Sequence, residues 1–153
     1  MARYAADTQV SSGQSRDEIE RTLARYGATA FAYASEPSRA QVAFEIEKRR
    51  VILRLTLPDR AQFRLTPTRR FERSPAEQEK AYEQAVRQRW RALALVIKAK
   101  LEAVEAGITT IEEEFLAHIA IPGAGTVHDW LGPRLDEVYR GAELPALMPG
   151  GRS

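Results

Sequence analysis

Arginines and aromatic residues alternate between residues 60 and 73, and this stretch has the clearest chemical character in the sequence. It contains five arginines and two phenylalanines, namely Arg60, Phe63, Arg64, Arg69, Arg70, Phe71 and Arg73. Guanidinium groups neutralise phosphates and aromatic rings stack on unpaired bases, so the pattern is typical of contacts with single-stranded nucleic acid. The alternative is that long basic side chains cover the rim of an apolar surface with their stems while their charges stay in water.

Basic residues continue along the helix that the sequence predicts after this loop. A rotation of about 100° per residue places Arg87, Arg91 and Lys98 on one flank of its apolar seam. Arg89 and Lys100 lie on the other flank. The predicted nucleic-acid site combines loop and helix residues: Arg64, Arg69, Arg70, Phe71, Arg73, Arg87, Arg91 and Lys98.

The charges of the chain are segregated along its length. Residues 48–100 hold fifteen Lys and Arg against five Asp and Glu, whereas residues 101–153 hold three against nine. A segregated basic block is the footprint of a phosphate-bearing or acidic partner. It could equally neutralise the acidic C-terminal third of the protein itself, or of another copy.

Two histidines could do other chemistry. Glu114 and His118 lie one helical turn apart, a spacing that suits a metal ion or a carboxylate that orients the ring. Two ligands do not make a site, and no second pair accompanies them. His128 follows a helix start, and Gly123–Gly125 lacks the lysine of a phosphate-binding loop. The sequence therefore predicts no metal, no cofactor and no enzyme.

Composition places the chain among ordinary globular proteins. Its 153 residues suit one α+β domain over residues 1–145, with a loose tail over 146–153. Cysteine is absent, which excludes disulfides and thiolate chemistry. The longest apolar run, Ala92–Ile97, is too short to cross a membrane, and we expect a cytoplasmic protein.

One long helix from Pro75 to Ala106 must position the basic residues. Ser74 caps it and Gly107 ends it. Its apolar seam runs through Tyr82, Val86, Trp90, Leu93, Ile97, Leu101 and Val104. Such a helix is longer than a small sheet can cover, so its excess length is expected to pack on later helices or on another subunit.

Shorter elements surround this helix. Ser15 starts a capping box, which predicts a short helix from about Arg16 to Tyr26. Period-two apolar residues predict three antiparallel strands, near residues 31–35, 41–46 and 51–57. Residues 47–50 form the second hairpin turn without the usual Asn-Gly, and Phe63 and Leu65 add a short edge strand.

Two further helices are predicted towards the C-terminus. Thr110 caps one that turns Phe115, Leu116 and Ile119 inward, and Thr126 caps another that is kinked or restarted at Pro133. The predicted fold is therefore α+β: a short N-terminal helix, a three- to four-stranded antiparallel meander packed on one long helix, and two shorter C-terminal helices.

Several segments resemble a family of small uncharacterised proteins encoded by bacteriophages and prophages. The resemblance rests on residues 3–8, 15–16, 19–20, 25–28, 87–93, 97–105 and 113–116. It implies a phage setting in a bacterial host cell and nothing catalytic. We hypothesise a non-catalytic accessory protein that contacts nucleic acid through the basic loop and long helix. The alternative is a protein-binding module or inhibitor, for example of host defence, that dimerises or grips a partner through the long helix.

Overall fold

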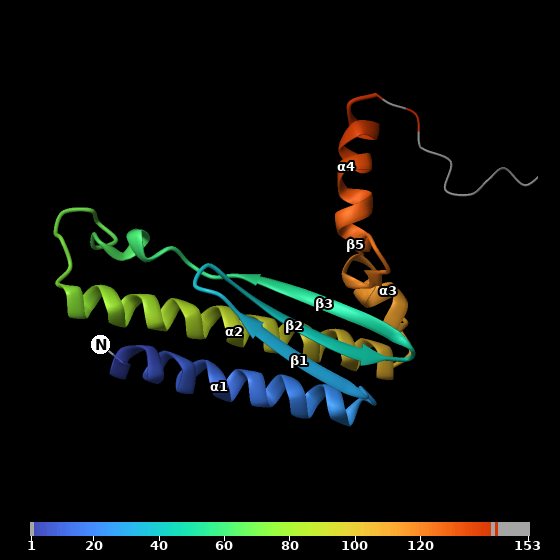
Figure 1. Ribbon diagram of the computed structural model, residues 1–153, viewed down its shortest axis with the longest axis horizontal. Helices are drawn as coiled ribbons and strands as arrows, with labels where there is room; N and C mark the ends of the chain where they lie inside the picture. Colours follow the sequence, from blue (N-terminus) through green and yellow to red (C-terminus); the bar gives the residue numbers. More distant parts are fainter. Residues whose placement is uncertain (1, 142, 144–153) are drawn as a thin grey trace, which may run out of the picture.

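The computed structural model describes residues 2–141 and 143 of the chain (Figure 1). Two long helices, α1 (Ala2–Arg25) and α2 (Pro75–Glu105), run side by side in the same direction. A three-stranded antiparallel sheet covers part of them, and a small C-terminal unit caps one end. This arrangement confirms the α+β class, with one long helix beside the sheet and shorter helices after it.

Helix α2 forms as the local signals predict. The Ser74 hydroxyl accepts a hydrogen bond from the Glu77 amide, and Pro75 occupies the first turn, where a missing amide hydrogen costs nothing. Gly107, with φ of +78°, follows the helix end. The buried residues are Tyr82, Val86, Trp90, Ala94, Ile97 and Leu101. Five of them belong to the predicted seam, Ala94 was not predicted, and the predicted Leu93 and Val104 are half-buried.

The predicted start of the first helix near Arg16 is wrong. Helix α1 begins at Ala2, and Ser15 lies in its interior instead of capping it. Ser12, Ile19 and Leu23 are buried, so one face of α1 packs against the body of the protein over at least three turns. Tertiary packing of this kind overrides a local capping signal. Helix α1 also packs along the part of α2 that the sheet does not cover. The excess length of α2 therefore packs on an earlier helix of the same chain, and not only on the later helices or the second subunit that the sequence suggested.

The sheet consists of β1 (Ala30–Ser35), β2 (Arg39–Ile46) and β3 (Arg49–Thr56), in the order β1-β2-β3. Val42 and Phe44 on β2 and Val51 and Leu53 on β3 are buried, so this face of the sheet forms the core with the helices. The Phe44 ring meets Phe115 edge-on, with the ring centres 5.6 Å apart. The sheet therefore joins the helical pair and the C-terminal unit in one core.

The β2–β3 turn lies within the predicted residues 47–50 but is shorter, because Arg49 and Arg50 already pair with β2. Glu47 and Lys48 connect the strands, with φ of +48° and +63°. Both residues thus adopt the left-handed conformation that a tight two-residue hairpin requires, although neither is glycine or asparagine. The sheet register places this turn, because the apolar residues on either side of it must share one face.

The predicted fourth strand does not form in the described part of the chain. Arg60–Phe63 instead make a short 3-10 helix, η1, whose start is capped by the Asp59 side chain. Phe63 leans on the Tyr82 ring of α2, with the ring centres 6.1 Å apart. Leu65 pairs only with Glu72, inside its own loop. Packing on α2 therefore replaces pairing with the sheet.

The C-terminal unit is built on two capping boxes. Thr110 and Glu113 cap α3 (Ile111–Phe115), and Thr126 and Asp129 cap α4 (Val127–Tyr139). Between these helices lie the 3-10 turn η2 (Leu116–His118) and a small hairpin of β4 (Ala120–Ile121) and β5 (Gly125–Thr126). Both predicted caps are confirmed.

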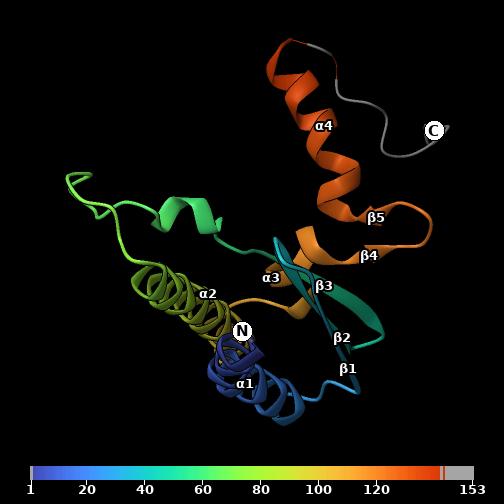
Figure 2. The same cartoon turned by 60° about the vertical axis from the view of Figure 1, so that its left-hand side comes forward.

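Two details of this unit differ from the prediction. Leu116, expected inward, is 48% exposed, because the chain turns into η2 directly after the buried Phe115. Helix α4 continues through Pro133 and has no buried residue. It stands away from the helical pair (Figures 1 and 2). The predicted tail, 146–153, lies outside the described residues.

Candidate nucleic-acid interface

Residues 64–73, here called the 64–73 loop, form a small closed hairpin between η1 and α2. The Thr66 amide donates to the Phe71 carbonyl at 2.9 Å, and the Arg73 amide donates to the Arg64 carbonyl at 2.8 Å. A β-turn closes the tip, with the Arg69 amide donating to the Thr66 carbonyl at 2.8 Å. These bonds hold the loop in one shape before any ligand binds.

Arg73 holds the base of this loop. Its Nη1 atom donates to the carbonyls of Phe63 and Leu65, at 3.2 and 2.9 Å. The Gln78 side chain in turn donates to the Arg73 carbonyl at 2.8 Å. Arg73 is half-buried. The structure thus places this predicted phosphate contact inside the loop as a clamp.

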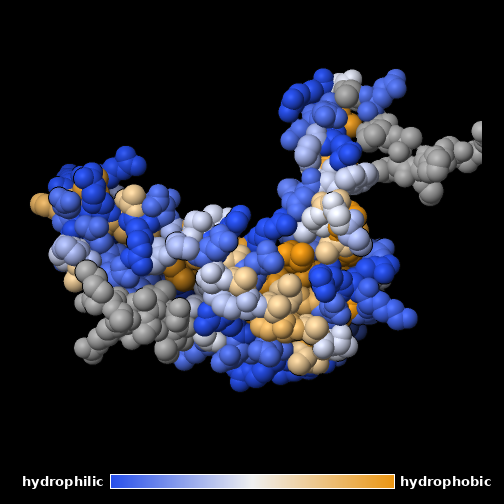
Figure 3. Space-filling model, viewed as in Figure 1, coloured by the Kyte–Doolittle hydropathy of each residue, from blue (hydrophilic) through white to orange (hydrophobic). Residues whose placement is uncertain are grey.

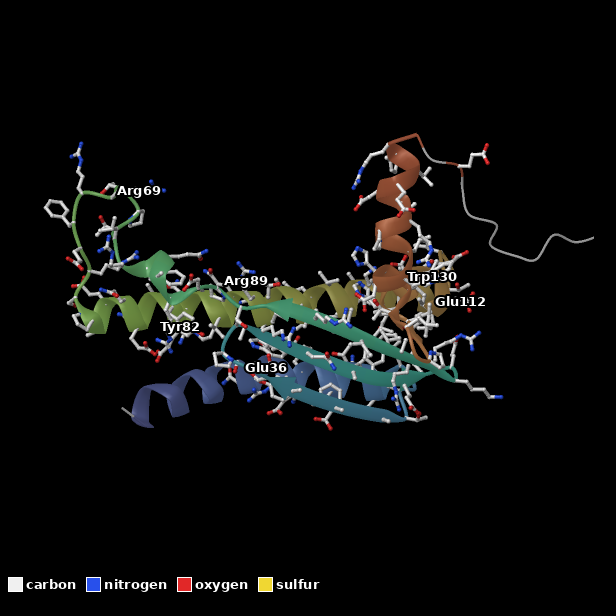
Figure 4. The ribbon with its side chains drawn as sticks, turned by 45° about the horizontal axis from the view of Figure 1, so that its top comes forward. Glu36, Arg69, Tyr82, Arg89, Glu112 and Trp130 are labelled. Atoms are coloured by element: carbon white, nitrogen blue, oxygen red, sulfur yellow. The ribbon has the colours of Figure 1, made fainter. Side chains whose placement is uncertain are left out.

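Three arginines of the loop remain available for a ligand, Arg69 and Arg70 near its tip and Arg64 at its base. Figure 4 shows Arg69 at the far end of the loop, away from the helices. The guanidinium groups of Arg64, Arg69 and Arg70 are exposed and have no ion-pair or hydrogen-bond partner in the described part of the chain. The Phe71 side chain beside them is 69% exposed. A cluster of open cations with one exposed ring is what the sequence predicts here.

Other members of the basic block are used internally. Arg49 pairs with Glu112 at 3.2 Å, Arg54 pairs with Asp129 at 2.8 Å, and Lys100 Nζ lies 3.1 Å from the Glu114 carboxylate. All three acids belong to the C-terminal third. The sequence left open whether the basic block meets a partner or neutralises the acidic C-terminal third. Arg49, Arg54 and Lys100 do the latter, within their own chain.

The predicted helix residues lie on a different surface from the loop. Phe63 and η1 flank a groove over the side of α2 that carries Arg89 and Val96. Arg89 also donates to the Thr56 carbonyl at 2.8 Å on this side. By helical rotation, the exposed Arg87, Arg91 and Lys98 lie on the opposite flank of the seam, which faces α1. The structure therefore does not bring loop and helix arginines together.

A second basic and aromatic cluster was not predicted. The Arg16 guanidinium lies over the Tyr33 ring, 4.4 Å from its centre, and Nη1 donates to the Tyr33 hydroxyl at 2.6 Å. The Tyr33 and Trp90 ring centres are 5.3 Å apart. These residues line a groove of about 980 Å³ between the helices and the end of the sheet, which Arg60 and Tyr82 also line. Each residue comes from a distant part of the sequence, so no local pattern could reveal the cluster.

The carboxylate that the sequence pairs with His118 is engaged elsewhere. The Glu114 carboxylate contacts Lys100, and burial lowers the pKa of His118, which Lys100 lowers further. Asp129 accepts from the Thr126 amide and from Arg54, which together lower the pKa of its carboxyl group. In the part of the chain that the structure describes, no three His, Cys, Asp or Glu side chains gather as a metal ion would need.

No helix among the described residues has the length and apolar character needed to cross a membrane. Comparison of the chain with protein-family models, with curated proteins and with solved structures finds no match.

Proposed function

We propose that this protein is a non-catalytic phage or prophage accessory protein that contacts nucleic acid, preferably single-stranded, through the 64–73 loop. The observation that carries the proposal is the loop tip. There Arg69 and Arg70 lack anionic partners within the described residues, as does Arg64 at the base of the loop, and Phe71, next in sequence to Arg70, is exposed.

The chemistry of the tip suits an unpaired strand. Open guanidinium groups neutralise phosphates at little cost, because they give up no existing ion pair. An exposed phenylalanine has no role in the core, and its ring offers a flat face on which a base can stack, worth about 1–3 kcal/mol. Duplex DNA hides its base faces, so Phe71 favours a single strand or a frayed end.

The loop and helix arginines are assigned different roles in this proposal. Arg69 and Arg70 supply the main phosphate contacts, and Arg73 keeps the loop in shape. Arg91 and Lys98, on the other flank of α2, extend the positive field and make no contact with the same few nucleotides. This division supplies a matched pair of variants for a test.

The test is a fluorescence titration with single- and double-stranded oligonucleotides at several salt concentrations. Arg69→Gln/Arg70→Gln should weaken binding and make the slope of log K against log salt shallower by about 1.4, since each single-strand phosphate contact contributes about 0.7. Arg91→Gln/Lys98→Gln removes the same charge and should have a smaller effect. Absence of binding by the wild type at micromolar concentration and low salt contradicts the proposal.

A second candidate function, of another class, is protein binding through α2. The observation that favours it is that Leu95 and Val96 on this helix are 56% and 47% exposed. Partner capture from host lysate, with and without nuclease, separates the two candidates. A protein that is retained after nuclease treatment, and lost with Leu95→Ser/Val96→Ser, supports the second.

A further inference from the structure

Strand β1 forms one edge of the sheet, and its outer side is bare. No strand, loop or side chain in the described part of the chain hydrogen-bonds to that side. The opposite edge differs, because Val51 of β3 pairs with Ile119 of the C-terminal unit. The protein thus covers one edge of its sheet and leaves the other open.

The hydrogen-bond pattern shows which groups this edge presents. Glu36 and Arg39 exchange both main-chain bonds, at 2.8 and 3.4 Å, at the closed end of the β1–β2 hairpin. Bonded pairs recur at every second residue of an antiparallel pair, so Ala34, Ala32 and Ala30 bond to β2. The N–H and C=O groups of Phe31, Tyr33 and Ser35 therefore point outward.

Nothing in β1 protects this edge. Proteins usually guard an open edge with charged residues, proline or a bulge. The six residues of β1 contain no charge and no proline, and Ala30, Ala32 and Ala34 keep the outer face small and flat. They continue an apolar patch over the sheet with Ala43 and Ile52, as seen in the space-filling view (Figure 3).

We propose that β1 pairs antiparallel with β1 of a second copy, around a two-fold axis at Tyr33. The outward groups are spaced symmetrically about Tyr33, so Tyr33 faces Tyr33, and Phe31 faces Ser35 of the second copy. This register uses every outward group and forms about six main-chain hydrogen bonds. A two-fold interface requires a self-complementary surface, and this edge is one.

The inference rests on the sheet edge alone and is independent of nucleic-acid binding.

The register can be tested with two matched variants. In this pairing Ala32 of one copy lies opposite Ala34 of the other, with Cα atoms about 4.5 Å apart. Both side chains are exposed on the outer face, so charged replacements leave the core intact. Ala32→Lys/Ala34→Lys opposes like charges at both positions, whereas Ala32→Lys/Ala34→Glu opposes unlike charges.

The measurement is the molar mass of the full chain in solution by multi-angle light scattering, with helix content checked by circular dichroism. We expect a dimer for the wild type and for the Lys/Glu variant, and a monomer for the Lys/Lys variant. Should the Lys/Lys variant misfold, Ser35→Pro serves instead, because it removes only an outward N–H. A wild type that stays monomeric at high micromolar concentration overturns the proposal. A Lys/Lys variant that remains a dimer also overturns the proposal, because the copies would then associate through another surface, for example α2.

Discussion

Arg70 and Arg73 are the same residue type, three positions apart, and have opposite roles in the structure. Arg70 is exposed with an open guanidinium group, whereas Arg73 is half-buried and bonded to two carbonyls. The sequence predicts the basic character of the 64–73 loop but not this division, which depends on how the loop closes. At the residue scale, the candidate site was therefore only partly predictable.

Arg73→Ala should destabilise the protein by about 1–2 kcal/mol, because two partly buried carbonyls lose a charged donor. It should also weaken oligonucleotide binding, although Arg73 itself makes no proposed contact. Urea denaturation and hydrogen exchange of the Phe71 amide measure the two effects. Arg70→Ala is the control, since it removes the same charge and should leave stability unchanged. Equal stability of the two variants would contradict the role of Arg73 as a clamp.

His118 should make the stability of the protein depend on pH. Burial and Lys100 lower the pKa of His118 below its usual 6.5, so the unfolded chain takes up the proton first as the pH falls. The free energy of unfolding therefore decreases on acidification below the usual histidine pKa and is fully restored above it. His118→Gln should flatten the urea midpoint between about pH 7 and pH 5. A pH slope in His118→Gln equal to that of the wild type would contradict this origin of the pH dependence.

At the scale of elements, helix-capping signals predicted helix starts correctly where no packing from elsewhere in the chain overrode them. Ser74, Thr110 and Thr126 all cap helices as predicted, because a cap needs only residues within one turn. The signal at Ser15 failed, since packing against α2 extends α1 through it. The strand predicted at Phe63 failed for the same reason, because Tyr82 of α2 provides a competing surface.

Substitutions in the β2–β3 turn should make the protein more stable. Glu47 and Lys48 both have positive φ, which costs a residue with a side chain about 1 kcal/mol or more. Glu47→Asn/Lys48→Gly should therefore raise the free energy of unfolding by about 1 kcal/mol. Thermal unfolding measures the gain. Glu47→Ala/Lys48→Ala removes the same charges and should give no gain; an equal effect would mean that charge, and not backbone geometry, limits the turn.

At the scale of the whole molecule, the basic block divides between two uses. Part of it joins the sheet and α2 to the acidic C-terminal unit, and part remains open at the 64–73 loop. The groove at Arg16, Tyr33 and Trp90 also exists only at this scale. Its residues lie far apart in the chain, which is why sequence patterns did not show it.

Helix α4 should be dispensable for folding. It has no buried residue, so a chain that stops after Asp129 keeps the Arg54–Asp129 ion pair and loses only half-buried and exposed side chains. Its unfolding free energy should stay within about 1 kcal/mol of the wild type. Phe115→Ala, at a fully buried site, should cost about 3–5 kcal/mol in the same assay. A large loss on truncation would show that α4 packs against the body in solution.

The closed form of the 64–73 loop also affects the heat of binding. A loop that is already held by its own hydrogen bonds does not need to fold around a strand. Binding should therefore bury little apolar surface beyond the Phe71 ring, and the heat-capacity change should be small. Its free energy would come mainly from the release of counterions, an entropic gain, so calorimetry should find affinity that is sensitive to salt and nearly insensitive to temperature.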